Sequence, residues 1–152
     1  MKNKNYNFKN IWIVSGNLKD AEAAILDMYS WSKWWEGLID ATITNPDVNV
    51  IGTKITAKWK STFGYQLKTQ LTITGYKPGE MIIFNSEGDL RGEGSWSFKA
   101  LSDTETSMEI IWNVATQKAW MNLFGPLLKP AFIYAHNKLM NEGEAGFRAY
   151  VN

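Results

Sequence analysis

Cysteine is absent from the sequence, histidine occurs once, as His136, and proline occurs only four times in 152 residues. The lack of cysteine excludes disulfide bonds, thiolate-bound zinc or iron–sulfur clusters, and a thiol nucleophile. A single imidazole is too few for a multi-histidine metal site, and the carboxylates show no ligand spacing. We therefore expect no metal and no cofactor.

An excess of one charge is also lacking, because 16 Lys and Arg face 15 Asp and Glu and leave a net charge near +1. Proteins that bind nucleic acids usually carry a basic excess or stripe, so we expect no nucleic-acid partner. No apolar run reaches the length of about 18 residues that a membrane-spanning helix needs. The apolar run near the N-terminus is too short for a signal-peptide core, and we expect a cytoplasmic protein.

Aromatic residues are what the sequence has in abundance: 8 Trp, 6 Tyr and 7 Phe, or 14% of the chain. The length suits one domain, residues 1–152, that buries roughly 68–70% of its unfolded surface. Hydrophobic residues at 45% and charged residues at 20% are ordinary values for a globular protein. The chain can therefore build a sizeable core without covalent cross-links.

The order of the elements follows from hydrophobic periodicity and from turn signals. A strand is predicted at residues 8–15, followed by short helices at residues 21–28 and 31–37. Six extended segments come next, separated by turn-forming groups such as Asn45-Pro46-Asp47. These segments cover residues 39–44, 51–60, 65–76, 81–87, 92–101 and 106–116. Strand after strand with short turns is typical of an antiparallel meander.

Apolar and polar side chains alternate along these segments, as Tyr65, Leu67 and Leu71 illustrate, so one sheet face is covered. Toward the C-terminus the period changes, and residues 119–128 and 130–151 have a helical pattern. The only large apolar surface left for the last helix is the inner face of the sheet. We predict an α+β helix-grip fold: a curved antiparallel sheet of about seven strands wrapped around a long C-terminal helix, with two short helices after the first strand.

Several segments resemble a known superfamily. Residues 27–38 read D-M-Y-S-W-S-K-W-W-E-G-L, residues 88–98 read G-D-L-R-G-E-G-S-W-S-F, and residues 104–114 are similar to that family's last strand. With His136 and Met140 in the last helix, the chain resembles the START-like, polyketide cyclase/dehydrase (SRPBCC) superfamily over nearly its whole length. The resemblance implies the helix-grip fold and a ligand space between sheet and helix. This fold hosts lipid carriers, hormone receptors, cyclases and chaperone regulators, so the resemblance does not choose a function.

Large side chains that read inward are the candidate ligand-binding residues. Two interpretations stay open: a dry core of bulky side chains, or a cavity walled by aromatic rings with Trp N–H and Tyr O–H groups as sparse polar contacts. The candidates are Trp59, Tyr65, Trp96, Phe98, Trp112, Phe132 and Met140.

His136 and Arg91 are the candidate polar groups. His136 lies on the inward face of the helix, where it either bonds a structural partner or projects into the cavity as a proton carrier. It is the one weak candidate for a catalytic residue. Arg91 shares its parity with solvent-facing residues, but the glycines around it permit a bulge that would turn it inward. An inward Arg91 would hold a carboxylate or an enolate oxygen.

These observations favour a protein that binds a small hydrophobic or amphipathic molecule, lipid-like or polyketide-like, between sheet and helix. The first alternative is a cyclase or dehydratase that uses His136 in the same cavity, although the inward faces carry few acids or bases. The second alternative is a protein-interaction module. A filled interior would favour the interaction module, an open apolar interior would favour ligand binding, and convergent ionisable groups would favour the enzyme.

Overall fold

A computed structural model of the chain describes residues 5–45, 50–123 and 125–151. Seven strands form one antiparallel sheet in the order β1-β7-β6-β5-β4-β3-β2. The elements in chain order are β1 (Asn5–Ser15), α1 (Leu18–Leu26), the 3-10 turn η2 (Met28–Ser30), α2 (Trp31–Trp34), β2 (Leu38–Ile43), β3 (Lys54–Lys60), β4 (Gln66–Lys77), β5 (Met81–Gly88), β6 (Leu90–Ser102), β7 (Glu105–Thr116), α3 (Ala119–Leu123) and α4 (Gly125–Val151). The predicted α+β helix-grip architecture is confirmed. No helix in the described ranges is long and apolar enough to cross a membrane.

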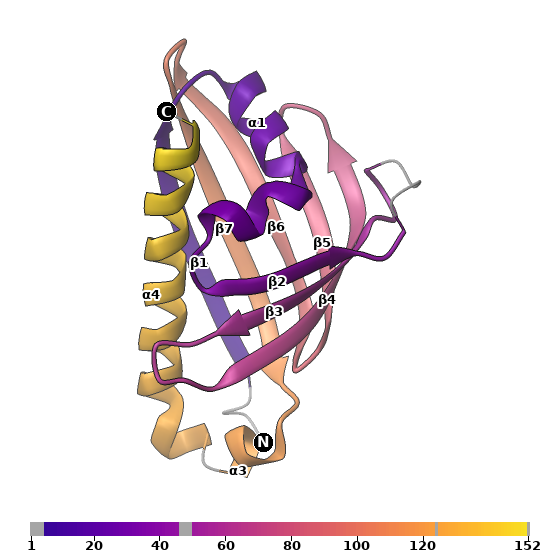
Figure 1. Cartoon of the computed structure of the whole chain (residues 1–152), viewed down its shortest axis with the longest axis vertical. Helices are drawn as coiled ribbons and strands as arrows, with labels where there is room; N and C mark the ends of the chain where they lie inside the picture. The colour runs from indigo at the N-terminus through magenta and orange to yellow at the C-terminus, as the bar shows by residue number, and fades with distance from the viewer. Residues whose placement is uncertain (1–4, 46–49, 124, 152) are drawn as a thin grey trace.

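The sheet is curled rather than flat. Figure 1 shows β2 and β3 crossing in front of β6 and β7, while α4 runs beside β1. The predicted alternation is confirmed on the inner face, where buried residues recur at every second position of β3 and β7 and from Gly94 to Phe98 of β6. Gly94 lies on this inner face, and a β-carbon there would come within 2.5 Å of the Phe84 ring on the neighbouring strand. The large ring of one strand therefore covers the bare backbone of the next.

The helices differ from the sequence prediction at their ends. Asn17 caps α1, since its side-chain oxygen accepts a hydrogen bond of 2.8 Å from the Asp20 backbone N–H. The second helix ends at Trp34 instead of Gly37, because Trp35 already has extended backbone angles. The predicted Asn45-Pro46-Asp47 turn falls partly on residues 46–49, which lie outside the described residues.

The C-terminal helix begins at Gly125, earlier than the expected start at Pro130. Proline is tolerated in the first turn of a helix, and Pro126 lies in that turn of α4. Pro130 lies inside the helix and is exposed to solvent. The segment expected as one apolar helix, residues 119–128, is divided between α3 and the first turn of α4.

Two glycines let the C-terminal half of α4 approach α2 closely. A β-carbon at Gly143 would lie 2.6 Å from the Trp35 indole, and one at Gly146 would collide with the backbone carbonyl oxygen of Trp34. The Trp35 indole N–H donates a hydrogen bond of 3.0 Å to the carbonyl of Leu139 on α4. The short tryptophan-rich helix and the long helix are thus fixed to each other by backbone contact.

Replacing Gly146 by alanine should therefore destabilise the fold. Helix propensity alone would make Gly146→Ala more stable by about 1 kcal/mol. We expect a loss of roughly 1–3 kcal/mol instead, because the added methyl group meets main chain that cannot move aside. Urea unfolding followed by tryptophan fluorescence measures the difference.

The control is Ala145→Gly at an exposed position of the same helix, which should lose about 1 kcal/mol from propensity alone. A Gly146→Ala protein more stable than the parent would show that α2 and α4 are not in backbone contact.

Candidate ligand-binding site

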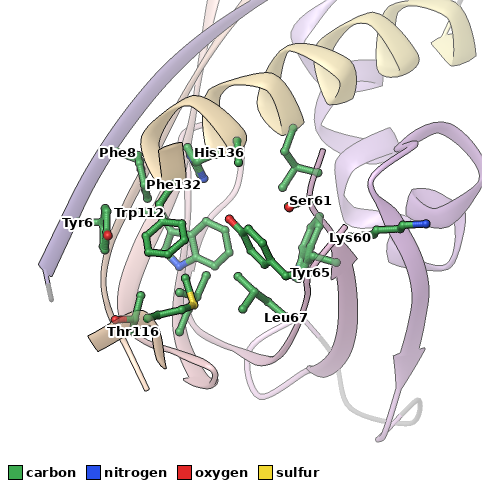
Figure 2. Close-up of a pocket in the computed structure, with 15 residues that line it drawn as sticks. Tyr6, Phe8, Lys60, Ser61, Tyr65, Leu67, Trp112, Thr116, Phe132 and His136 are labelled. Atoms are coloured by element: carbon green, nitrogen blue, oxygen red, sulfur yellow. The ribbon is translucent and has the colours of Figure 1, made fainter. Parts of the chain in front are cut away.

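A cavity of about 60 Å³, here called the outer cavity, lies between the sheet and the first half of α4 (Figure 2). Its walls come from β1, β3, β4, β6, β7, α3 and α4, and most of its lining surface is apolar. Aromatic rings contact one another around it at centroid distances of 5.6–6.3 Å. The lining residues are Tyr6, Phe8, Trp59, Lys60, Ser61, Tyr65, Leu67, Leu90, Trp112, Thr116, Met121, Phe132, Ala135, His136 and Leu139.

A second cavity of about 50 Å³, the inner cavity, lies deeper under α1 and α2. Its lining residues are Ile25, Met28, Trp31, Trp35, Ile55, Trp59, Leu71, Ile73, Ile82, Phe84, Trp96, Ile110, Trp112 and Met140. Trp59 and Trp112 border both cavities, and their rings lie 6.4 Å apart. The two indoles therefore form the partition between the cavities.

A wider groove of about 260 Å³, the entrance groove, adjoins the outer cavity at the surface. Ala135 and Leu139 of α4, with Lys60 and Ser61, border both spaces. The Leu139 side chain lies against Gly37, where any β-carbon would collide with it. Leu139 is therefore the side chain that separates the outer cavity from the groove.

Contacts across the groove join α4 to the turn between β3 and β4. The Lys138 ammonium donates a hydrogen bond of 3.1 Å to the Thr62 hydroxyl. The rings of Phe63 and Tyr134 lie 6.1 Å apart. All four residues are exposed, so these contacts can break without uncovering a core.

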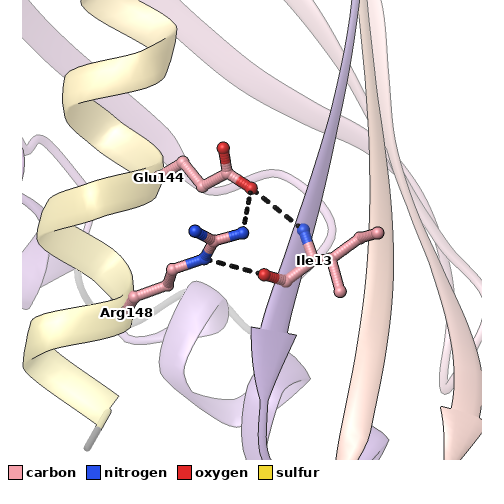
Figure 3. A network of polar contacts seen from close by, with 3 residues as sticks. All are labelled: Ile13, Glu144 and Arg148. Atoms are coloured by element: carbon pink, nitrogen blue, oxygen red, sulfur yellow. Dashed lines mark hydrogen bonds and ion pairs between the residues drawn. The ribbon is translucent and has the colours of Figure 1, made fainter.

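The opposite half of α4 is anchored to β1, which is an edge strand of the sheet (Figure 3). The Ile13 backbone N–H donates to the Glu144 carboxylate at 3.0 Å, and Arg148 Nε donates to the Ile13 carbonyl at 2.8 Å. The same Glu144 carboxylate pairs with Arg148 at 3.0 Å. Side chains of α4 thus occupy edge groups that would otherwise be free to pair with another strand.

Most of the predicted ligand-binding residues border one of the two cavities. The outer cavity brings together Trp59, Tyr65, Trp112, Phe132 and His136. The inner cavity adds Trp96 and Met140. Phe98 is buried but borders neither cavity.

Arg91 does not face the cavity, and the expectation of an inward-turned arginine is wrong. Arg91 is exposed on the outer face of β6, in a shallow groove with Glu87, Glu93 and Asn113. The pairing of β6 with β7 is regular from Leu90 to Ala100, so no bulge reverses its direction. The glycines at 92 and 94 serve close strand packing instead.

Sequence reasoning missed several lining residues at element ends. Tyr6 was missed because the first strand begins at Asn5 rather than Phe8, although Tyr6 shares its parity with Phe8 and Trp12. Ser61 lies just beyond the end of β3, and Thr116 is the last residue of β7. Ala135 and Leu139 lie on either side of His136 in α4. The helical spacing of Ala135 and Leu139 from Phe132 was a usable signal.

His136 is held in place by aromatic stacking. Its ring lies 3.5 Å from the Phe8 ring at an interplanar angle of 15°, and 5.9 Å from the Trp112 ring. Its Nε2 atom is buried without a hydrogen-bond partner, and so is Nε1 of Trp112. Burial lowers the pKa of His136 from 6.5 to about 3, so the imidazole is neutral at physiological pH.

Apart from Lys60, the other polar groups that line the outer cavity are neutral as well. Burial raises the pKa of the Tyr6 and Tyr65 hydroxyls, and a hydrogen bond with Ser61 partly opposes the shift at Tyr65. Among the described residues no carboxylate lines either cavity. The described chain also holds no group of three or more His, Asp or Glu placed to bind a metal. The site therefore offers hydrogen bonds and apolar contact rather than charge.

Solved structures with the same architecture are numerous, although no protein-family model and no curated protein matches the sequence. The aromatase/cyclase Zhui from Streptomyces sp. R1128 aligns over 97% of this chain and 93% of its own, with a TM-score of 0.76 at 7% identity. The di-domain ARO/CYC BexL from the BE-7585A biosynthetic pathway aligns over 99% of this chain, with a TM-score of 0.74 at 12% identity. A START superfamily protein from Mycobacterium smegmatis aligns over 95% of this chain and 96% of its own, with a TM-score of 0.69 at 13% identity.

The chain has the START-like helix-grip fold. The resemblance stated from the sequence is thereby confirmed at the level of the fold. The chain spans about half the length of BexL and of a second di-domain ARO/CYC, StfQ from the steffimycin biosynthetic pathway, covering 51% and 52% of them. Identities of 7–13% among these neighbours carry the START-like fold but no particular activity.

Stability should depend on pH through His136. Its pKa is about 3 in the folded chain and about 6.5 when unfolded, so below pH 6.5 only the unfolded chain binds the proton. The contribution of the neutral His136 to the free energy of unfolding is therefore fully present above pH 6.5. As the pH falls from 6.5 toward 3, it decreases by about 1.4 kcal/mol per pH unit. Between pH 7.5 and 5.0 the parent should lose about 2 kcal/mol more than His136→Phe in urea unfolding.

Because the chain contains one histidine, NMR of its imidazole protons gives an assigned control. A ring resonance that titrates near pH 6.5 in the folded protein would contradict the buried, unpaired state of His136.

Proposed function

We propose that the protein binds one small, largely hydrophobic molecule in the outer cavity, entering from the entrance groove. The observation that carries this proposal is the apolar cavity walled by aromatic rings between the sheet and α4. Native interiors are usually packed with few voids larger than a water molecule. Two adjoining cavities are therefore unusual and favour a binding site. A pocket with aromatic walls and a few polar atoms is the usual form of a small-molecule site.

The volumes limit how the molecule can lie. About 60 Å³ is less than the roughly 150 Å³ that holds a benzene ring in an engineered cavity. A ligand with one or more rings therefore extends into the entrance groove, displaces Leu139, or moves the indole partition toward the inner cavity. The groove supplies about 260 Å³ directly beside the outer cavity. Lipid-like and polyketide-like molecules both meet these terms.

Ligand binding is favoured over the two alternatives. The names of the aromatase/cyclase neighbours support an enzyme, and His136 borders the cavity as that proposal requires. An imidazole with a pKa of about 3 is a weak base, however, and a general acid–base group works best with a pKa near the working pH. The two small apolar cavities count against a pure protein-interaction module, for which a filled core was expected.

Two substitutions on α4 should change binding in opposite ways. Ala135→Leu adds three carbons to the wall of the outer cavity and should weaken binding at least about tenfold, the value of roughly 1.4 kcal/mol. Leu139→Ala removes the side chain between cavity and groove and should accelerate association. Titration with an uncharged fluorescent probe such as Nile red measures the affinity, and stopped-flow mixing with the same probe measures the association rate. Native mass spectrometry of freshly purified protein shows whether a small molecule is already bound.

Matched controls make the same chemical changes on the same helix at exposed positions. Ala149→Leu and Leu127→Ala should leave the affinity and the association rate unchanged. Equal binding by Ala135→Leu and Ala149→Leu would place the probe outside the outer cavity and refute the proposed site.

A further inference from the structure

Two buried polar atoms at the outer cavity lack any partner in the protein. One is Nε2 of His136 on α4, and the other is Nε1 of Trp112 on β7. A buried polar group without a hydrogen bond costs roughly the full desolvation of that group, so such groups usually have a partner. A third unpaired atom, Oδ1 of Asn10, borders neither cavity. The two nitrogens are therefore the unsatisfied buried groups that belong to residues lining the outer cavity.

The two atoms belong to neighbouring rings in the lining of the cavity, one on α4 and one on β7. His136 stacks on Phe8, which pairs with Trp112 in the register of β1 and β7. The His136 and Trp112 rings lie 5.9 Å apart, and Figure 2 shows the His136 nitrogen facing the space that the lining residues enclose. Both nitrogens are covered in the unliganded structure, so a ligand meets them when its entry displaces a neighbouring side chain.

The chemistry of the two nitrogens limits the ligand groups that can serve them. The Trp112 indole N–H only donates, so it needs an oxygen that accepts. Nε2 of a neutral imidazole accepts in one tautomer and donates in the other, and a hydroxyl group satisfies both. An oxygen-free hydrocarbon would leave both nitrogens unpaired.

The surroundings of the cavity exclude a buried charge on the ligand. Lys60 is the one charged side chain among the described residues that line it, and Figure 2 shows its ammonium group directed away from the cavity. An anionic head group placed between Trp112 and His136 would therefore lose its hydration without gaining a counter-charge.

We propose that the ligand is an uncharged, hydroxyl-bearing hydrophobic molecule, with its hydroxyl group on His136 Nε2 and a second oxygen on the Trp112 indole N–H. This assignment rests on the proposed function and sharpens it. It excludes fatty acids and other anions as the buried part of the ligand.

The test compares 2-naphthol with 2-methylnaphthalene, which differ by a hydroxyl and a methyl group of similar size. The ratio of their two dissociation constants should shift by roughly 5- to 150-fold toward the methyl compound when His136 becomes phenylalanine. Phenylalanine keeps the stacking on Phe8 but removes the nitrogen. Using the ratio cancels the different hydration of the two probes and any general loss of stability.

Trp112→Phe tests the second contact in the same way, with the dihydroxynaphthalene isomers compared with 2-naphthol. The parent protein should bind at least one dihydroxynaphthalene isomer more tightly than 2-naphthol. Trp112→Phe should abolish that preference and leave the ratio of the dissociation constants of 2-naphthol and 2-methylnaphthalene unchanged. Leu67→Ala is the control, because it alters the wall of the same cavity without touching a polar atom and should leave every ratio unchanged.

A measurement on the parent protein avoids dependence on variants. The ¹⁵N resonance of His136 Nε2 should move on addition of 2-naphthol and stay in place with 2-methylnaphthalene. Equal ratios in the parent and His136→Phe, with both probes bound, would overturn this inference and leave ligand binding intact. Tighter binding of 2-naphthoate than of 2-naphthol would also overturn it, and failure of every probe to bind would contradict the proposed function itself.

Discussion

The packing of one long helix against a curled sheet determines the interior of this protein. Trp12 lies where that packing is tightest, with its indole 5.2–6.3 Å from the rings of Trp34, Trp35, Trp96 and Phe147. Beside it α4 carries glycines at 143 and 146, so helix and tryptophans interlock. From Pro126 to Glu142 the helix has no glycine, and the large side chains of Phe132 and His136 line the outer cavity there. Tight contact at one half of α4 thus produces space at the other.

Much of the fold was predictable because strong, regular patterns dominate the sequence. Alternation in β3, β6 and β7 placed Trp59, Trp96 and Trp112 on the inner face, and the structure agrees. The resemblance in residues 27–38 and 88–98 agreed with the same topology. These signals are local and repeat over many residues, so single exceptions do not disturb them.

The site was only partly predictable, because a cavity depends on small differences in how elements meet. Alternation along β6 placed Trp96 and Phe98 on the same face of the sheet. Which of the two borders a cavity depends on how the helices pack over the whole sheet, and this does not follow from local sequence. The glycines beside Arg91 suggested a bulge, whereas the structure uses Gly94 to receive the Phe84 ring. Sequence left open whether the aromatic residues fill the core or wall a cavity, since composition is the same in both cases.

The two unpaired nitrogens that line the outer cavity destabilise the protein when no ligand is bound. Each unpaired nitrogen, on His136 and on Trp112, costs about 1–3 kcal/mol compared with a bonded one. A protein selected for stability alone would place hydrocarbon at these positions. Groups that destabilise the empty state and become satisfied in a complex are typical of binding sites, where some local rules of folding are broken.

The attachment of α4 to β1 gives the helix one fixed half and one half held by weaker contacts. Glu144 and Arg148 bond both backbone groups of Ile13, while near the entrance groove exposed contacts such as that of Lys138 with Thr62 join helix and turn. The anchor lies on the half of α4 away from the outer cavity, so entry of a ligand beside the groove half does not require the anchor to break. The β1 edge then remains covered throughout the exchange, so loading and release would not expose a strand that recruits other chains into aggregates.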